Sequence, residues 1–145
     1  MKRLFKKLLF VVTMVFIAVA CSLDSDSTQD FDMVFIPIES VTMPDYVTSG
    51  QTSLISMQYR KTNDCYYVSD EPLYEINGTT RTVAIQAVVI ERANCRTIEY
   101  AAPETKSFNF TCPITAERNF TFKFYQGVNA QGEDQYLEVI VPVQQ

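Results

Sequence analysis

The sequence predicts an all-β protein, a single antiparallel β-sandwich of about seven strands. From residue 33 onward apolar and polar residues alternate, which is the side-chain period of a strand buried on one face. No window shows the 3.6-residue period of a long amphipathic helix. Turn residues recur about every 8–15 residues, a spacing that favours an immunoglobulin-like sandwich. A small closed barrel is the alternative, because periodicity does not separate the two.

The first predicted strand contains the alternating apolar residues Val34, Ile36 and Ile38. Pro37 lies among them and predicts an edge position, because proline has no N–H to donate to a strand ladder. Three further strands are predicted at residues 54–60, 65–68 and 74–76.

The strand at residues 81–91 is predicted to be central in its sheet. Asn77-Gly78 favours a type I′ turn just before it, so the chain enters this strand through a tight hairpin. From Val83 to Ile90 both faces of the strand are apolar, and Gln86 is the only polar residue of this stretch on the face opposite Val83. A strand with two apolar faces is typical of a position covered on both sides.

The last three predicted strands lie at residues 106–112, 119–125 and 137–143. Their inward positions carry five phenylalanines: Phe108, Phe110, Phe120, Phe122 and Phe124. These side chains are predicted to fill one core. Burial of each contributes about 2–3 kcal/mol before the loss of conformational entropy is counted.

The N-terminus predicts an exported, lipid-anchored protein. A basic segment precedes the apolar run Leu8–Ala20, which is too short to be a stable membrane span and is typical of a secretory signal. Ala18-Val19-Ala20-Cys21 resembles a bacterial lipobox, in which the signal is cut before a cysteine that carries acyl chains. The alternatives are an ordinary signal peptide with an incidental Cys21 and an uncut anchor.

The predicted organisation is a lipoprotein signal peptide at residues 1–20, an acidic flexible tether at 21–32 and the sandwich at 33–145. The tether is polar and carries four aspartates, so it buries too little apolar surface to fold. Asp26-Ser27-Thr28 within it resembles an O-glycosylation sequon, with plain linker as the alternative. All 17 acidic residues but only 8 of the 12 basic ones follow residue 20, which gives residues 21–145 a net charge of −9. This charge disfavours nucleic-acid partners.

Three cysteines remain in the domain, and an exported protein occupies a compartment that permits disulfides. Cys112 alternates with Phe108 and Phe110 along the predicted strand and so faces inward with them. It is therefore predicted to be a free thiol in the core. Cys65 and Cys95 lie in polar surroundings near strand ends and are predicted to pair. A Cys65–Cys112 bridge, a Cys95–Cys112 bridge and three free thiols are the alternatives.

No catalytic residue, metal site or cofactor is predicted. The chain has no histidine, which removes the Ser-His-Asp and Cys-His arrangements and the usual zinc sites. Its carboxylate pairs, such as Asp70-Glu71 and Glu133-Asp134, are adjacent in loops, where solvated surface charge is the usual interpretation. The loop around Asn129 offers oxygen ligands but lacks the spaced aspartates of a calcium loop. A non-enzymatic role is therefore expected.

Tyr66, Tyr67 and Tyr74 form a candidate ligand surface, because tyrosine offers a large contact area at a low entropic cost. The alternative is that tyrosines on a two-sided strand divide between core and cover. The predicted function is a lipid-anchored envelope module that binds a protein or glycan partner. A structural accessory subunit of an outer-membrane complex is the alternative.

The order of several motifs resembles a family of small uncharacterised lipoproteins of Bacteroidetes and Flavobacteria with an immunoglobulin-like domain. The motifs are Asn63-Asp64-Cys65-Tyr66, Asn77-Gly78, Asn94-Cys95, Phe108-Asn109-Phe110, Phe120 to Gly127 and Val139 to Val143. The resemblance covers nearly the whole mature domain. It implies two domain cysteines at positions 65 and 95, with Cys112 additional, and carries no established activity. Ser22 follows the lipobox cysteine where some proteobacterial lipoproteins carry an aspartate that retains them at the inner membrane. The protein is therefore expected at the bacterial outer membrane, on its periplasmic or surface face.

Overall fold

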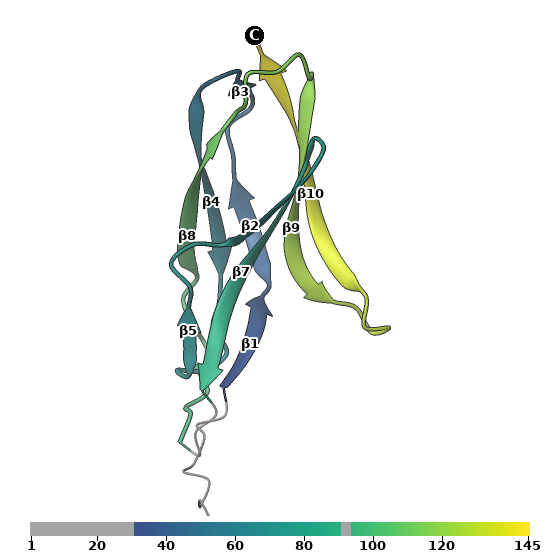
Figure 1. Ribbon diagram of the computed structural model, residues 1–145. Helices are drawn as coiled ribbons and strands as arrows, with labels where there is room; N and C mark the ends of the chain where they lie inside the picture. Colours follow the sequence, from purple (N-terminus) through teal and green to yellow (C-terminus); the bar gives the residue numbers. More distant parts are fainter. Residues whose placement is uncertain (1–30, 91–93) are drawn as a thin grey trace, which may run out of the picture.

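The computed structural model describes residues 31–90 and 94–145, which form two packed β-sheets (Figure 1). The predicted signal peptide, Cys21 and the tether up to residue 30 lie outside the described residues. Among the described residues there is no helix long and apolar enough to cross a membrane. The first strand begins at Phe31, two residues before the predicted domain boundary, because Phe31 pairs with Ile90.

The all-β sandwich prediction is confirmed, with ten strands in the described residues. They are β1 (Phe31–Ile36), β2 (Ile38–Thr42), β3 (Val47–Thr48), β4 (Thr52–Tyr59), β5 (Tyr66–Val68), β6 (Leu73–Asn77), β7 (Thr80–Ile90), β8 (Glu104–Thr111), β9 (Asn119–Val128) and β10 (Asp134–Gln144). Neither sheet closes on itself, so the small barrel is not what these residues form.

The larger sheet has seven strands, and the smaller sheet contains β2, β4 and β8 in that order. Strand β7 is central, as predicted. One edge of β7 pairs with β5 and β6. The other edge pairs with β1, which is antiparallel to it, and with β9, which is parallel to it. The sheet continues from β9 to β10 and ends at the short β3.

Two strand pairs are parallel, a departure from the predicted antiparallel arrangement. These pairs are β7 with β9 and β10 with β3. Between β7 and β9 the chain passes through β8 in the other sheet, so it returns to the larger sheet running in the same direction. Sequence periodicity shows which residues face inward but not which sheet each strand joins.

Pro37 divides the predicted first strand into β1 and β2, which belong to different sheets. Both strands lie at the ends of their sheet orders, so the predicted edge position is confirmed. This division, together with the two-residue β3, accounts for most of the difference between ten observed strands and about seven expected. The β1 end of the domain and the C-terminus lie at opposite ends of the molecule (Figure 1).

The core lies between the sheets and is dominated by phenylalanines. Phe120, Phe122 and Phe124 of β9 are fully buried. Phe110 reaches them from β8, with ring centroids 5.5 Å from Phe120 and 5.1 Å from Phe122. Edge-to-face contacts of this kind join the two sheets. Four of the five phenylalanines are therefore buried as predicted, whereas Phe108 is only partly buried.

Candidate functional site

Cys65 and Cys95 form the predicted disulfide, with an S–S distance of 2.02 Å. The bridge fastens the start of β5 to the loop that follows β7. Asp64 supports this junction: its Oδ1 accepts a hydrogen bond from the Arg96 backbone N–H at 2.8 Å. That bond, assisted by the Arg96 side chain, lowers the pKa of Asp64. Cys112 is buried and free, also as predicted.

The structure does not bring the three predicted tyrosines together into one exposed surface. Tyr66 pairs with Val89, and Tyr67 pairs with Val88, so the two point to opposite faces of the sheet. Tyr66 packs against the core, whereas Tyr67 is half exposed. Tyr74 lies on β6, where it is partly buried and lines a cleft. The division into core and cover is thus the one that the structure shows.

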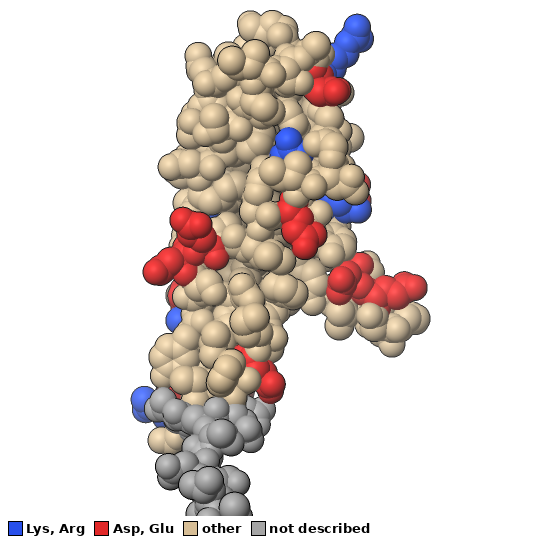
Figure 2. Space-filling view, in the orientation of Figure 1, with Lys and Arg blue, Asp and Glu red and all other residues tan. Residues whose placement is uncertain are grey.

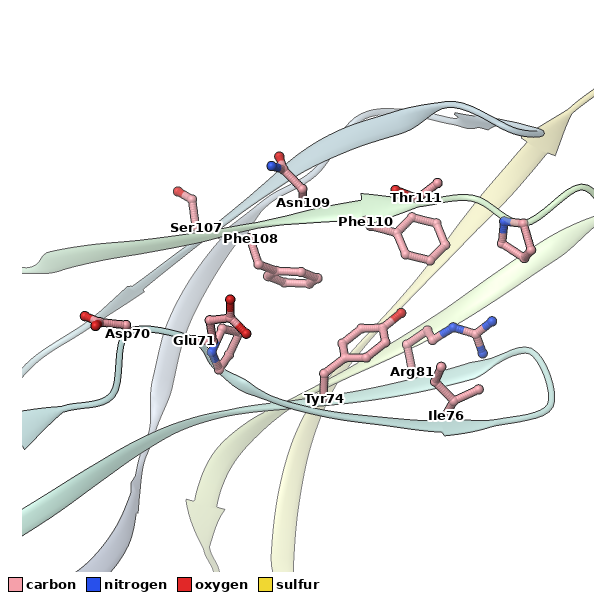
Figure 3. A pocket seen from close by; sticks show the side chains of 12 residues that line it. Asp70, Glu71, Tyr74, Ile76, Arg81, Ser107, Phe108, Asn109, Phe110 and Thr111 are labelled. Carbon is pink, nitrogen blue, oxygen red and sulfur yellow. The ribbon is translucent and has the colours of Figure 1, made fainter.

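A cleft of about 890 Å³ opens between the margin of the larger sheet at β6 and the margin of the smaller sheet at β8 (Figure 3). Its lining comes from the β5–β6 loop, β6, β7, β8 and the segment after β8. The lining residues are Asp70, Glu71, Pro72, Tyr74, Ile76, Arg81, Ser107, Phe108, Asn109, Phe110, Thr111 and Pro113.

The interior of the cleft is aromatic. Tyr74 and Phe108 face each other across it, with ring centroids 5.7 Å apart, and Phe110 lies beside them (Figure 3). Ser107, Asn109 and Thr111 point away from the cleft, because alternate residues of β8 face opposite sides. Ser107 and Thr111 instead hydrogen-bond across the outer face to β4. The β8 wall therefore offers phenylalanine rings and strand backbone.

Arg81 is the only charged residue that is buried among the described residues, with 5% of its surface exposed. Its Nη1 donates to the carbonyl oxygens of Gly78 at 2.7 Å and Thr80 at 3.0 Å. Its guanidinium carbon lies 4.7 Å from the centre of the Phe120 ring, a favourable cation–π geometry. No carboxylate of the described residues forms a salt bridge with it.

Arg81 also acts on Tyr74. Burial raises the pKa of Tyr74, and the nearby Arg81 charge opposes that rise without cancelling it. Tyr74 therefore carries a neutral hydroxyl at physiological pH. The cleft thus combines aromatic rings along its length with a cation and a phenolic hydroxyl at one end. At the opposite end lie the carboxylates of Asp70 and Glu71 (Figure 3).

Both margins of the cleft are unpaired strand edges within the described residues. Strand β8 pairs only with β4, and β6 pairs only with β7. The backbone N–H and C=O groups on the other edge of each strand are free to bond to another chain. The cleft is thus bounded along both sides by backbone hydrogen-bonding groups.

The acidic hairpin loop after β9 has a structural role. Asn129 Oδ1 accepts the backbone N–H groups of Gln131 and Glu133, each at 2.9 Å. Asn129 Nδ2 in turn donates to Glu133 Oε2 at 2.9 Å. The polar groups of this loop therefore shape the turn itself. Within the described ranges, no three Cys, Asp or Glu side chains gather as metal ligands would.

Sequence reasoning missed Arg81 and Phe108 as site residues. Arg81 could have been found from the strand alternation, because it lies two and four residues before Val83 and Ile85 and so shares their inward face. A charged side chain is unusual at such a position. Phe108 shares the parity of Phe110, but its partial exposure depends on where the smaller sheet ends. That limit follows from sheet order and is not visible in strand periodicity.

Comparison of the chain with protein-family models, with curated proteins and with solved structures finds no match. The resemblance to Bacteroidetes lipoproteins therefore stays a prediction, and the case for a function depends on the cleft.

Proposed function

We propose that this protein is a lipid-anchored, non-catalytic binding module of the cell envelope whose ligand site is the cleft between β6 and β8. The observation that carries the proposal is the combination of an aromatic interior with one buried, carboxylate-free cation at its end. Ligand sites are commonly apolar concave surfaces of about 300–1,000 Å³ with a few convergent polar groups, and this cleft falls within that range.

A binding role fits the chemistry of the cleft better than a catalytic one. Proton transfer at neutral pH is most often carried by histidine, which the chain lacks. The cleft carboxylates, Asp70 and Glu71, are adjacent in one loop, on the same side of the cleft (Figure 3). They therefore do not flank a bond from two sides as a glycosidase pair does.

The proposed anchor is Cys21, whose acyl chains would hold the module at the membrane. Phe31 lies ten positions after Cys21, a reach of about 33 Å when the chain is fully extended. Replacement of the lipid-bearing residue by Cys21→Ala is expected to release the exported protein from the membrane fraction. Retention in the membrane after washing with high salt would contradict the anchor but not the cleft.

Site-directed photo-crosslinking tests the cleft. A photoreactive amino acid at Ile76, which lines the cleft and is 66% exposed, is expected to capture an envelope component in living cells. The matched control is the same substitution at Ile140, which is 67% exposed on β10, away from the cleft. Capture from Ile76 should disappear when Tyr74→Ser is added. Equal capture from both positions would contradict a ligand site in the cleft.

A second candidate function, a structural subunit of an envelope complex, is favoured by an apolar surface on the larger sheet. We call it the outer face, and it comprises Phe31, Met33, Phe35, Tyr67, Val88 and Ile90, which their cross-strand pairing places on one side. Phe31 and Met33 are 66% and 65% exposed. In the view of Figure 2 uncharged residues dominate the surface and the acidic groups are scattered. Exposed apolar surface of this kind is typical of an interface.

The two functions are separable by mutation. If the outer face packs against another envelope protein, the double variant Phe31→Ser, Met33→Ser should lose that protein on co-purification. Crosslinking from Ile76 should be unchanged in the same variant. Loss of the Ile76 crosslink instead would favour a single interface that includes both surfaces.

A further inference from the structure

We propose that the occupant of the cleft is an extended peptide that pairs with the free edge of β8 as an added strand and places a carboxylate on Arg81. This inference rests on the proposed function, that the cleft is the ligand site, and adds the chemical class of the ligand. Three features carry it: the two free strand edges, the aromatic interior and the separation of charge along the cleft.

The free edges favour a peptide over other ligands. Along the cleft, β8 presents the backbone of residues 107–111 without a partner among the described residues, and β6 presents another unpaired edge opposite. An extended chain lying between them satisfies its own N–H and C=O groups on an existing sheet, which is the basis of β-strand addition. A five-residue segment spans about 17 Å, the length of the β8 segment that lines the cleft.

The interior matches the other requirement of strand addition, pockets for alternate side chains. Side chains on one face of an added strand would point inward, towards Tyr74, Phe108 and Phe110. These rings leave apolar surface uncovered, since Tyr74 and Phe108 are only partly buried. The ligand is therefore expected to be apolar at alternate positions where it passes the rings.

The charges give the ligand a polarity. Asp70 and Glu71 lie at one end of the cleft and Arg81 at the other, so a complementary peptide is cationic at the first end and anionic at the second (Figure 3). Arg81 Nη1 donates to two backbone carbonyls, and the guanidinium lies beside the Tyr74 hydroxyl. Arg81 also lines the cleft and has no carboxylate partner among the described residues, so a ligand carboxylate in the cleft would supply its countercharge.

A planar carboxylate is the anion that best fits these donors, because arginine binds carboxylates with two parallel hydrogen bonds. The carboxylate has two sources in a peptide, the C-terminal group and an Asp or Glu side chain. With the C-terminal group, the peptide would run parallel to β8, whose residues 107 to 111 advance towards the Arg81 end (Figure 3).

The test uses peptides and a charge change at the rim of the cleft. Random octapeptides with free C-termini are selected for binding to the intact domain, and the best binders are resynthesised in three forms. These forms carry a free C-terminus, a C-terminal amide, or an amide preceded by Asp. Binding by the first alone identifies the α-carboxylate as the source, and binding by the first and third shows that any carboxylate suffices. Equal binding by all three would overturn the role of Arg81.

The variant pair Ile76→Glu and Ile76→Lys supplies the matched control. Ile76 is exposed and pairs directly with Arg81, so Ile76→Glu places a competing carboxylate beside the guanidinium without altering the core. We expect Ile76→Glu to weaken binding about tenfold or more, the effect of losing one hydrogen bond to a charged group. Ile76→Lys removes the same apolar side chain without adding a carboxylate and should weaken binding clearly less than Ile76→Glu does. Equal losses in both variants, or none in either, would contradict a carboxylate on Arg81.

Amide hydrogen exchange distinguishes strand addition from binding through side chains alone. An added strand should slow exchange at every second amide of residues 105–111, because only alternate N–H groups point to the free edge. Uniform or absent protection would contradict pairing with β8. If the Ile76 crosslinker captures a glycan and selection yields no peptide, the proposed binding function stands and the peptide inference fails.

Discussion

Removal of the Cys65–Cys95 bridge offers a quantitative test of how this domain is stabilised. The bridge closes a loop of 30 residues in sequence. The chain-entropy relation for a loop of that length gives about 3.6 kcal/mol at 25 °C, most of it through restriction of the unfolded chain. A domain of this size commonly has an unfolding free energy of about 5–15 kcal/mol, so the bridge would supply a large fraction.

The measurement is urea unfolding of the domain, followed by far-ultraviolet circular dichroism with and without dithiothreitol. We expect the unfolding free energy to fall by about 3–4 kcal/mol on reduction. The slope of the unfolding free energy against urea concentration should become steeper, because a reduced unfolded chain exposes more surface. The folded state should change little near the bridge. There the Asp64 N–H still donates to the Arg96 carbonyl at 3.2 Å, and the Ile98 N–H donates to that of Thr62 at 3.0 Å.

Two variants make the result interpretable. The double variant Cys65→Ala, Cys95→Ala should unfold at the same urea concentration with and without dithiothreitol. Cys112→Ala removes the buried free thiol and should leave the effect of reduction unchanged. A reduction effect below about 1 kcal/mol in the fully reduced protein would refute the entropic reasoning. A peptide map with a bridge to Cys112 would refute the pairing itself.

Three further changes test the core, the β-bulge at Gly127 where the pairing of β9 with β10 shifts register, and a charge cluster. Phe122→Ala removes a fully buried ring and should cost about 3–5 kcal/mol in urea unfolding, against less than about 0.5 kcal/mol for the exposed control Ile140→Ala. Gly127→Ala should lower the melting temperature, because φ is +102° and the added Cβ would lie 3.4 Å from the Pro37 ring; no change would contradict strain at this bulge. Lys61, with help from the Tyr59 hydroxyl, lowers the pKa of Glu104 below 4.5, so the stability it adds is present above that pH and lost as pH falls. Glu104→Gln should therefore flatten the acid side of a plot of melting temperature against pH, and an unchanged slope would contradict the assignment.

Strand periodicity predicted much of the fold, because the face of a strand on which a residue lies depends only on its position along that strand. The inward set on β9, the buried thiol of Cys112 and the pairing of Cys65 with Cys95 all follow from neighbours along the chain. The edge position of the segment around Pro37 follows from one missing N–H. None of these required knowledge of which strands lie side by side.

The candidate site depends on sheet order, which parity does not contain. Tyr74 and Phe108 are 34 residues apart in the chain. They share a cleft only because β6 and β8 lie at the margins of their respective sheets. The same limit applies to β7, whose two apolar faces predicted cover on both sides. Its inner face is buried, but Val88 on the outer face is only partly covered within the described residues.

The cleft follows from the unequal width of the two sheets. A sheet of three strands does not cover one of seven, so inward side chains at both margins of the larger sheet stay partly exposed. At the far margin these are Leu137 and Val139 of β10, whose hairpin with β9 diverges from the rest of the sheet (Figure 1). At the β6 margin the chain instead places a buried arginine, at a position where an aliphatic residue would fit the pattern. A buried cation costs free energy unless partners compensate it. Two backbone carbonyls and the Phe120 ring contact Arg81, but no carboxylate of the described residues does, so a ligand anion in the adjoining cleft would complete its partners. This arrangement favours a margin that binds a ligand over one that is merely underpacked.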